Sequence, residues 1–380
     1  MKNESRRYIF WSLIGLGIVL RYAVMCIGHN FDFDSYCIVG EISGNFRNVY
    51  AETARYNYAP VFLIIQGLFY RISQISTENW MLIYRILIVT LLTAADLGIT
   101  AFISRKYSEN KALLFFLNPI SIIITGYHNQ FDNIAVLFGL LSILYYNNDE
   151  KMNRRDLGFI LMLSLSLMTK HILFLIPVFI LFSGKLPLKK RIVYSCTPPA
   201  VFLLSFVPFA LSSNEALQGI INNVFLYRSK STSPLLYYFY ELIGLPSGTK
   251  FIVYIILMIV VAWIVRKMQY ENKILIYLIA MVAFASSMTN QYLVIPMVAL
   301  CVLNVGVWDK IYVIVMSIFI VLHADGFNLL SVITETFSGK IVDLLNRTIW
   351  ISGYIVGTWI LLFALIHVLV KNRAAIINGA

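Results

Sequence analysis

Apolar stretches of about 15 to 25 residues recur from Tyr8 to Val370, and most of the charged residues lie between them. A helix of that length crosses the roughly 30 Å hydrocarbon core of a bilayer. With 59% hydrophobic and 13% charged residues, the chain has too little polar surface to cover a water-soluble globule. We therefore expect an all-α, polytopic membrane protein that forms a single domain over residues 1–380.

The basic residues between these stretches predict the topology, because loops rich in Lys and Arg stay in the cytoplasm. Segment 58–76 would break this pattern if it crossed the membrane, so we expect it to be an interfacial or re-entrant helix that lies in the first outer loop. About twelve spans and two cytoplasmic termini then remain. The expected spans are 8–28, 81–103, 111–126, 132–147, 157–169, 172–184, 192–211, 250–266, 274–288, 291–306, 311–325 and 348–370. The long outer segments are 29–80 and 212–249.

Two composition features exclude other classes of protein. The net charge of +11 is explained by basic residues on the inner face, so it does not indicate a nucleic-acid partner. The four cysteines show no CxxC spacing and mostly lie in apolar stretches, so neither a disulfide framework nor a zinc site is expected.

Polar residues collect on the predicted outer face in five separate segments. Several polar clusters at one membrane depth predict a cavity that opens outward, although helix ends that meet headgroups and water would also be polar. The clusters are Asp32, Asp34 and Glu41; His128 to Asn133; Thr169 to His171; Tyr227 to Lys230; and Thr289 to Tyr292.

The chemistry of these clusters favours a carboxylate that faces cations. Asp32 and Asp34 can share a metal ion, or one can act as a base while the other orients it, although such a pair also occurs in acidic loops and helix caps. Cations beside such a base suit a phosphate that leaves as a hydroxyl attacks. The candidate cations are Lys170, Arg228, His128 and His171. Alternatively, Lys170 snorkels to the interface and Arg228 contacts headgroups.

Several motifs resemble those of a known enzyme family. The segment Asp32-Phe33-Asp34-Ser35-Tyr36, with Glu41-Ile42-Ser43, resembles the first luminal loop of the dolichyl-phosphate-glucose-dependent glucosyltransferases of asparagine-linked glycosylation. The run from Asn118-Pro119 to His128-Asn129-Gln130-Phe131-Asp132, and the run from Lys170-His171 to Pro177, are similar to later motifs of that family in the same order. The segment Arg55 to Pro60 resembles its Tyr-Pro-Pro segment.

The resemblance covers residues 29–185. In the second half, Asn290-Gln291-Tyr292 departs from the His-Glu-Lys of the glucosyltransferases and is closer to the Gln-Tyr of the first mannosyltransferase of glycolipid-anchor synthesis. Both families belong to the GT-C superfamily of membrane glycosyltransferases, which leaves the choice between glucose and mannose open.

This resemblance implies inverting transfer of a hexose from a polyprenyl-phosphate donor to a lipid-linked glycan or another glycan acceptor. It implies that Asp32 is the general base and that Asp34 orients the acceptor or helps to hold a metal. Lys170, His171, Arg228 and His128 would bind the donor phosphate. The sugar and the acceptor would contact Gln130, Asp132, Glu41, Tyr58, Gln291 and Tyr292.

The resemblance requires no cofactor, and the Asp32–Asp34 pair allows a divalent metal ion. The composition favours the plasma membrane of a bacterium or an archaeon, with the active site on the outer side; in a eukaryote the membrane would be that of the endoplasmic reticulum. Two alternatives remain, namely a transporter or flippase of lipid-linked sugars and a non-catalytic membrane subunit. Asp96 is the deep carboxylate that a transporter would use, and we expect it instead to bond neighbouring hydroxyl groups.

Overall fold

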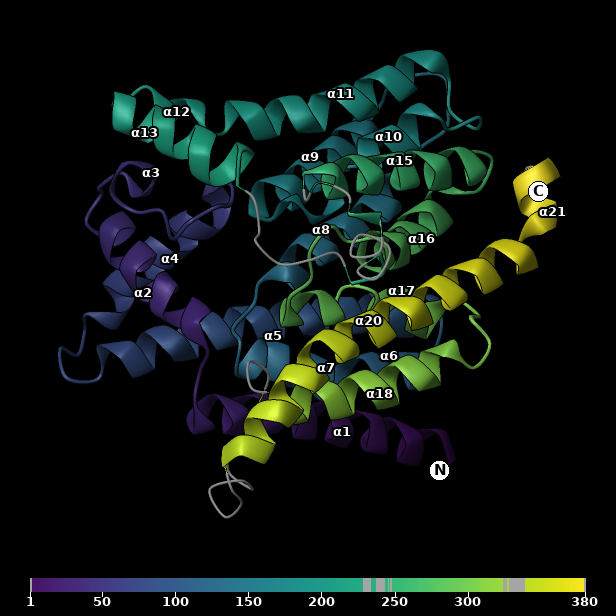
Figure 1. Cartoon of the computed structure of the whole chain (residues 1–380). Coiled ribbons are helices and arrows are strands. Elements are labelled where there is room, and N and C mark those ends of the chain that lie inside the picture. Colours follow the sequence, from purple (N-terminus) through teal and green to yellow (C-terminus); the bar gives the residue numbers. More distant parts are fainter. Residues whose placement is uncertain are drawn as a thin grey trace.

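A computed structural model describes residues 2–227, 234–236, 243, 244, 246, 248–323, 327 and 339–378, and this part of the chain is helical and contains no β-strand (Figure 1). The first half comprises α1 (Lys2–Ile27), α2 (Phe31–Gly44), α3 (Val49–Glu52), α4 (Pro60–Ser73), α5 (Trp80–Lys106), α6 (Glu109–Leu117), α7 (Pro119–Gly126), α8 (Asp132–Tyr145), α9 (Arg154–Thr169), the 3-10 turn η1 (His171–Leu173) and α10 (Ile176–Leu181). The second half comprises α11 (Leu188–Leu204), α12 (Val207–Ala210), α13 (Asn214–Gly219), the π-helical turn η2 (Ile220–Phe225), α15 (Thr249–Ile264), α16 (Tyr270–Ala283), the 3-10 turn η3 (Asn290–Leu293), α17 (Met297–Val302), α18 (Trp308–Leu322), α20 (Gly339–Lys371) and α21 (Arg373–Asn378).

Four helices in the described residues are long and apolar enough to cross a membrane, and they cover Ser5–Ile27, Trp80–Lys106, Leu188–Ala210 and Gly353–Lys371. Their outward faces carry large apolar side chains that no other part of the described chain covers, which suits contact with lipid rather than water. Examples on α1 and α20 are Trp11, Val19, Trp359, Phe363 and Val370. These helices support the expected all-α membrane protein.

The expectation of about twelve continuous spans is not confirmed, because several expected spans are short or interrupted helices. Span 111–126 is divided into α6 and α7 at Asn118–Pro119. The Asn118 side chain donates to the carbonyl oxygens of Leu114 and Phe115 and accepts from the amide of Ser121, so it satisfies the end of one helix and the start of the next. Spans 172–184 and 291–306 are likewise divided, into η1 with α10 and η3 with α17.

The expected non-spanning segment forms α4, whose 14 residues extend about 21 Å at 1.5 Å per residue. That length is below the roughly 30 Å of a hydrocarbon core. Because α8 and α16, which were expected to span, also have 14 residues, length alone does not test the expected surface location of α4. In Figure 1, α2, α3 and α4 lie together at one side of the molecule, next to α12 and α13. Both termini lie at the opposite side, because α1, α5, α11 and α20 run between the two sides (Figure 1).

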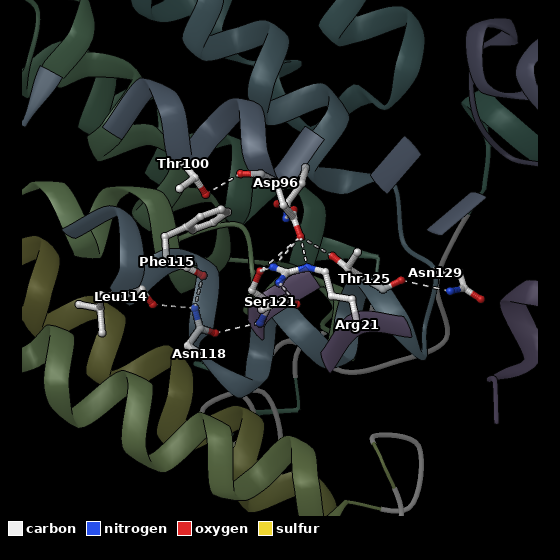
Figure 2. A network of polar contacts seen from close by, with 11 residues as sticks. Arg21, Asp96, Thr100, Leu114, Phe115, Asn118, Ser121, Thr125 and Asn129 are labelled. Carbon is white, nitrogen blue, oxygen red and sulfur yellow. Dashed lines mark hydrogen bonds and ion pairs between the residues drawn. The ribbon is translucent and has the colours of Figure 1, made fainter. Parts of the chain in front are cut away.

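A buried polar network joins α1, α5, α7 and α8, and Figure 2 shows Arg21, Asp96 and Thr125 within it. Asp96 of α5 accepts from Arg21 of α1, with an Nε to Oδ2 distance of 3.0 Å, and both side chains are fully buried. Its carboxylate also accepts from Thr125 of α7 at 2.7 Å and from Asn133 of α8 at 2.6 Å. The expectation that Asp96 bonds neighbouring hydroxyl groups is confirmed, and its arginine partner is an additional finding.

Candidate functional site

A cavity of about 1660 Å³ opens between the first outer loop and the second half of the chain. One part of its wall is polar and comes from the start of α2, from residues 54–58 and from the end of α9. The other part is largely apolar and comes from α11, η2 and α15, with Phe202, Leu203, Val224, Phe225, Phe251 and Ile255. The cavity therefore suits a molecule with a polar head and an apolar tail.

The start of α2 places Asp32 at this cavity. The Asn30 side chain caps the helix by accepting from the backbone amide of Asp32, so the helix begins at Phe31. Asp32 is half-buried and lines the cavity. Asp34 follows two residues later, about 200° around the helix, and its side chain is 55% exposed.

Asp34 is not among the described residues that line the cavity; its Oδ1 lies 3.8 Å from Nδ1 of His29. Glu41, about two turns further along α2, is exposed and also lies outside the lining. The two aspartates therefore do not converge on one point, which disfavours the shared metal ion that the sequence allowed. Among the described residues, no group of three or more His, Cys, Asp or Glu side chains is arranged to hold a metal ion.

Gln130 connects Asp32 to a buried ion pair. Its Nε2 donates to Oδ2 of Asp32 at 2.5 Å, and its Oε1 accepts from Lys170 Nζ at 3.4 Å. Lys170 Nζ in turn lies 2.5 Å from Oδ2 of Asp132. One chain of hydrogen bonds thus runs from Asp32 through Gln130 and Lys170 to Asp132, and it fixes the position of each side chain.

Lys170 faces the cavity from the C-terminal end of α9, and it is almost fully buried. Its ammonium lies 4.9 Å from the ring centroid of Tyr58 and 4.7 Å from that of Phe131, which adds cation–π attraction to the ion pair. A lysine ammonium has three N–H donors, and the bonds to Asp132 and Gln130 engage two. Lys170 is therefore a buried member of the site rather than a lysine that snorkels to the interface.

Burial raises the pKa of the Asp32 carboxyl, while the charge of Lys170 and the hydrogen bonds from Asn30 and Gln130 oppose that shift. A carboxylate with a raised pKa is a stronger base than a solvated one, provided that it is still ionised at the working pH. The environment of Asp32 therefore suits proton abstraction.

His171 lines the cavity next to Lys170. The surrounding protein and the neighbouring positive charge lower the pKa of His171 to about 4. Its imidazole is therefore neutral near pH 7, and it offers hydrogen bonds rather than the positive charge that the sequence suggested. His128 also lines the cavity, and its Nδ1 lies 2.9 Å from the side-chain Nδ2 of Asn30.

The remaining predicted residues occupy three kinds of position. Tyr58, Gln291 and Tyr292 line the cavity. Gln130 and Asp132 are buried behind its wall, within the hydrogen-bond chain. Arg228 lies outside the described residues, as does Lys230 of the same cluster.

Sequence reasoning missed several residues of the cavity wall. Arg55 and Asn57 line it. The segment that contains them was noted for its resemblance, but neither residue was predicted to belong to the site. Lys250 lines the opposite wall at the start of α15, where an apolar span gave no reason to expect a cation at a site. Tyr36, Tyr254 and Tyr277 complete a tyrosine-rich lining.

A search of family models, curated proteins and solved structures finds no match to this chain.

Proposed function

We propose that the protein transfers a hexose from a polyprenyl-phosphate donor to a lipid-linked glycan or another glycan acceptor, with inversion at the anomeric carbon. One observation carries this proposal: Asp32 is the single carboxylate among the described residues that line the cavity, and several basic side chains line the same cavity. The cations among them are Arg55, Lys170 and Lys250, and the imidazoles of His128 and His171 add hydrogen-bonding groups.

The two-part cavity supports a lipid-linked donor. The sugar and phosphate would lie at the polar wall, close to Asp32 and Lys170, and the polyprenyl chain would lie along the apolar wall of α11, η2 and α15. The tyrosines between them supply hydroxyl groups for sugar contacts. Burial raises the pKa of Tyr58, so its hydroxyl stays protonated and can donate a hydrogen bond.

In the proposed reaction, Asp32 accepts the proton of the acceptor hydroxyl as its oxygen bonds to the anomeric carbon. The bond from that carbon to the phosphate oxygen breaks on the opposite face of the sugar, and the polyprenyl phosphate leaves. The remaining N–H of Lys170 and the cavity cations would stabilise the charge that develops on the phosphate. With Asp32 as the base, the described cavity lining offers no second carboxylate that could form a glycosyl-enzyme intermediate, which favours inversion.

Glucose is the favoured sugar, because the motifs of residues 29–185 resemble those of the glucosyltransferases. Mannose is the alternative, because Asn290-Gln291-Tyr292 is closer to the mannosyltransferase motif. The composition favours a bacterial or archaeal plasma membrane, with the site on its outer side and no cofactor required. To identify the sugar, the purified protein is incubated with acceptor-containing membranes and radiolabelled polyprenyl-phosphate glucose or mannose, in parallel reactions. The donor whose label is transferred to the acceptor identifies the sugar. If neither donor is consumed by the wild-type protein, the proposal is wrong.

Asp32→Asn is the central test, because the substitution removes the base and retains the side-chain shape. We expect transfer to fall by about 100-fold or more, and the matched variant Asp34→Asn, two residues away on the same helix, to keep near-wild-type activity. In the wild type, kcat/KM should decrease as the pH falls through a pKa above that of an ordinary aspartate, because protonation disables the base. Turnover of Asp32→Asn within a few-fold of wild type would show that Asp32 is not the base.

Two further measurements separate the mechanism from its alternatives. NMR of the product reports inversion or retention, and retention contradicts a single displacement. Full activity in EDTA excludes an essential divalent metal. A flippase would move the labelled donor across a vesicle membrane and leave its glycosidic bond intact, so transport without any transferred sugar favours that alternative.

A further inference from the structure

A second, smaller cavity lies at the end of the bundle away from the candidate site. Its volume is about 510 Å³, and it is formed by the first turns of α1, the last turns of α5 and the start of α6. α1 has 26 residues, a length of about 39 Å, and the candidate site begins directly after its other end, at Asn30. If α1 crosses the membrane, the two cavities therefore lie at opposite membrane faces.

Three arginines line this second cavity, and one carboxylate accompanies them. Arg6, Arg7 and Arg105 are exposed, and none forms an ion pair with a described residue. The adjacent Lys106, in contrast, is paired with Glu271 at 2.6 Å. Glu109 also lines the cavity, so the wall keeps an excess of positive charge. An excess of unpaired guanidinium groups favours a phosphate ligand.

The rest of the wall is suited to a lipid rather than to a soluble anion. Phe10, Trp11, Ile14 and Leu97 form its apolar part, and Thr100 and Ser104 lie between Leu97 and Arg105 along α5. Trp11 is 58% exposed on the outward face of α1. Tryptophan and arginine at the end of an apolar helix are typical of the membrane interface, where phospholipid phosphates lie.

We propose that this cavity binds the headgroup phosphate of an anionic glycerophospholipid, on the membrane face opposite to the candidate site. The phosphate lies among Arg6, Arg7 and Arg105, and the glycerol and the first part of the acyl chains lie against Trp11 and Leu97. This inference depends on α1 and α5 crossing the membrane and is independent of the sugar-transfer proposal.

Native mass spectrometry of the detergent-solubilised full chain tests the proposal, with phosphatidylglycerol and phosphatidylcholine as probes. We expect phosphatidylglycerol to bind at least tenfold more tightly. The triple variant Arg6→Gln, Arg7→Gln, Arg105→Gln should lose that preference. The control triple variant Lys151→Gln, Arg154→Gln, Lys189→Gln removes the same charge from exposed positions outside the cavity and should keep it.

A steric variant tests the cavity without any change of charge. Ala101 is exposed and lines the cavity, so Ala101→Trp should fill it and weaken phosphatidylglycerol binding at least tenfold. Ala23→Trp, at an exposed α1 position outside the lining, is its control. This pair decides the question if the triple variant does not fold.

Three outcomes would overturn the proposal: equal binding of the two lipids, equal losses in the cavity and control variants, and displacement of phosphatidylglycerol by millimolar inorganic phosphate. The last would show that the cavity takes a soluble anion and not a lipid.

Discussion

At the residue scale, the two most informative carboxylates have different surroundings. Asp32 is half-buried at a cavity, where burial raises the pKa of its carboxyl. Asp96 is fully buried and accepts hydrogen bonds from an arginine, a threonine and an asparagine. The first arrangement leaves a carboxylate able to take a proton from a ligand. In the second, both carboxylate oxygens accept hydrogen bonds inside the bundle, which suits a structural role.

The Arg21–Asp96 pair gives a stability prediction. Asp96→Asn leaves the buried Arg21 charge without its counter-ion, so we expect the free energy of unfolding in detergent micelles to fall by about 3–5 kcal/mol. The exposed pair Arg47–Glu52, with a 2.7 Å separation and side chains 48% and 35% exposed, is the control. Glu52→Gln should cost about 1 kcal/mol or less. Similar losses in chemical unfolding of the two variants would mean that the buried pair adds no special stability.

At the element scale, the position of the site depends on how α7 packs on α1. Gly126 is the last residue of α7, directly before the segment that carries His128, Gln130 and Asp132. A Cβ at Gly126 would lie 2.5 Å from the carbonyl oxygen of Arg21 and 3.2 Å from its carbonyl carbon. Both atoms belong to the backbone, so neither can move without a shift of the helix. Glycine is therefore required for this close approach.

Gly126→Ala should separate α1 from α7 and lower the free energy of unfolding by about 1–3 kcal/mol. Gly15→Ala, in the middle of α1, is the matched control, because a Cβ there meets no atom within 4 Å. This control should be neutral or stabilising, by up to about 1 kcal/mol, since alanine favours helix formation. Thermal melting of both variants in the same detergent measures the difference, and a Gly126→Ala protein as stable as Gly15→Ala would contradict the packing argument.

At the scale of the whole molecule, the arrangement predicts which face each loop reaches. Phe46, 81% exposed in the turn after α2, belongs to the expected outer face, and Lys151, exposed before α9, belongs to the cytoplasmic face. In a cysteine-free background, Phe46→Cys should react with an impermeant maleimide added to right-side-out vesicles. Lys151→Cys should react only after the membrane is permeabilised. Labelling of Lys151→Cys in sealed vesicles would reverse the topology inferred from basic residues.

The sequence by itself determined the class of fold and the region of the candidate site. Its apolar stretches require helices, because a backbone in lipid must satisfy its own hydrogen bonds. Its polar clusters predicted a cavity at one end of those helices. In the structure, residues from four of the clusters line one cavity, namely Asp32, His128, Lys170 and Tyr292. Helix lengths were predicted less well, because the apolar stretch 111–126 gives no sign in its hydropathy that Asn118 and Pro119 divide it into two helices.

Only the tertiary structure decided which of the candidate residues lie together. The residue pattern alone does not distinguish the roles of Asp32 and Asp34. In the helix that begins at Phe31, Asp32 lines the cavity and Asp34 is exposed. Lys170 pairs with Asp132, which is 38 residues away in the sequence, and Arg21 pairs with Asp96, which is 75 residues away. Such partners are set by the packing of whole helices against each other, and local sequence patterns carry no record of that packing.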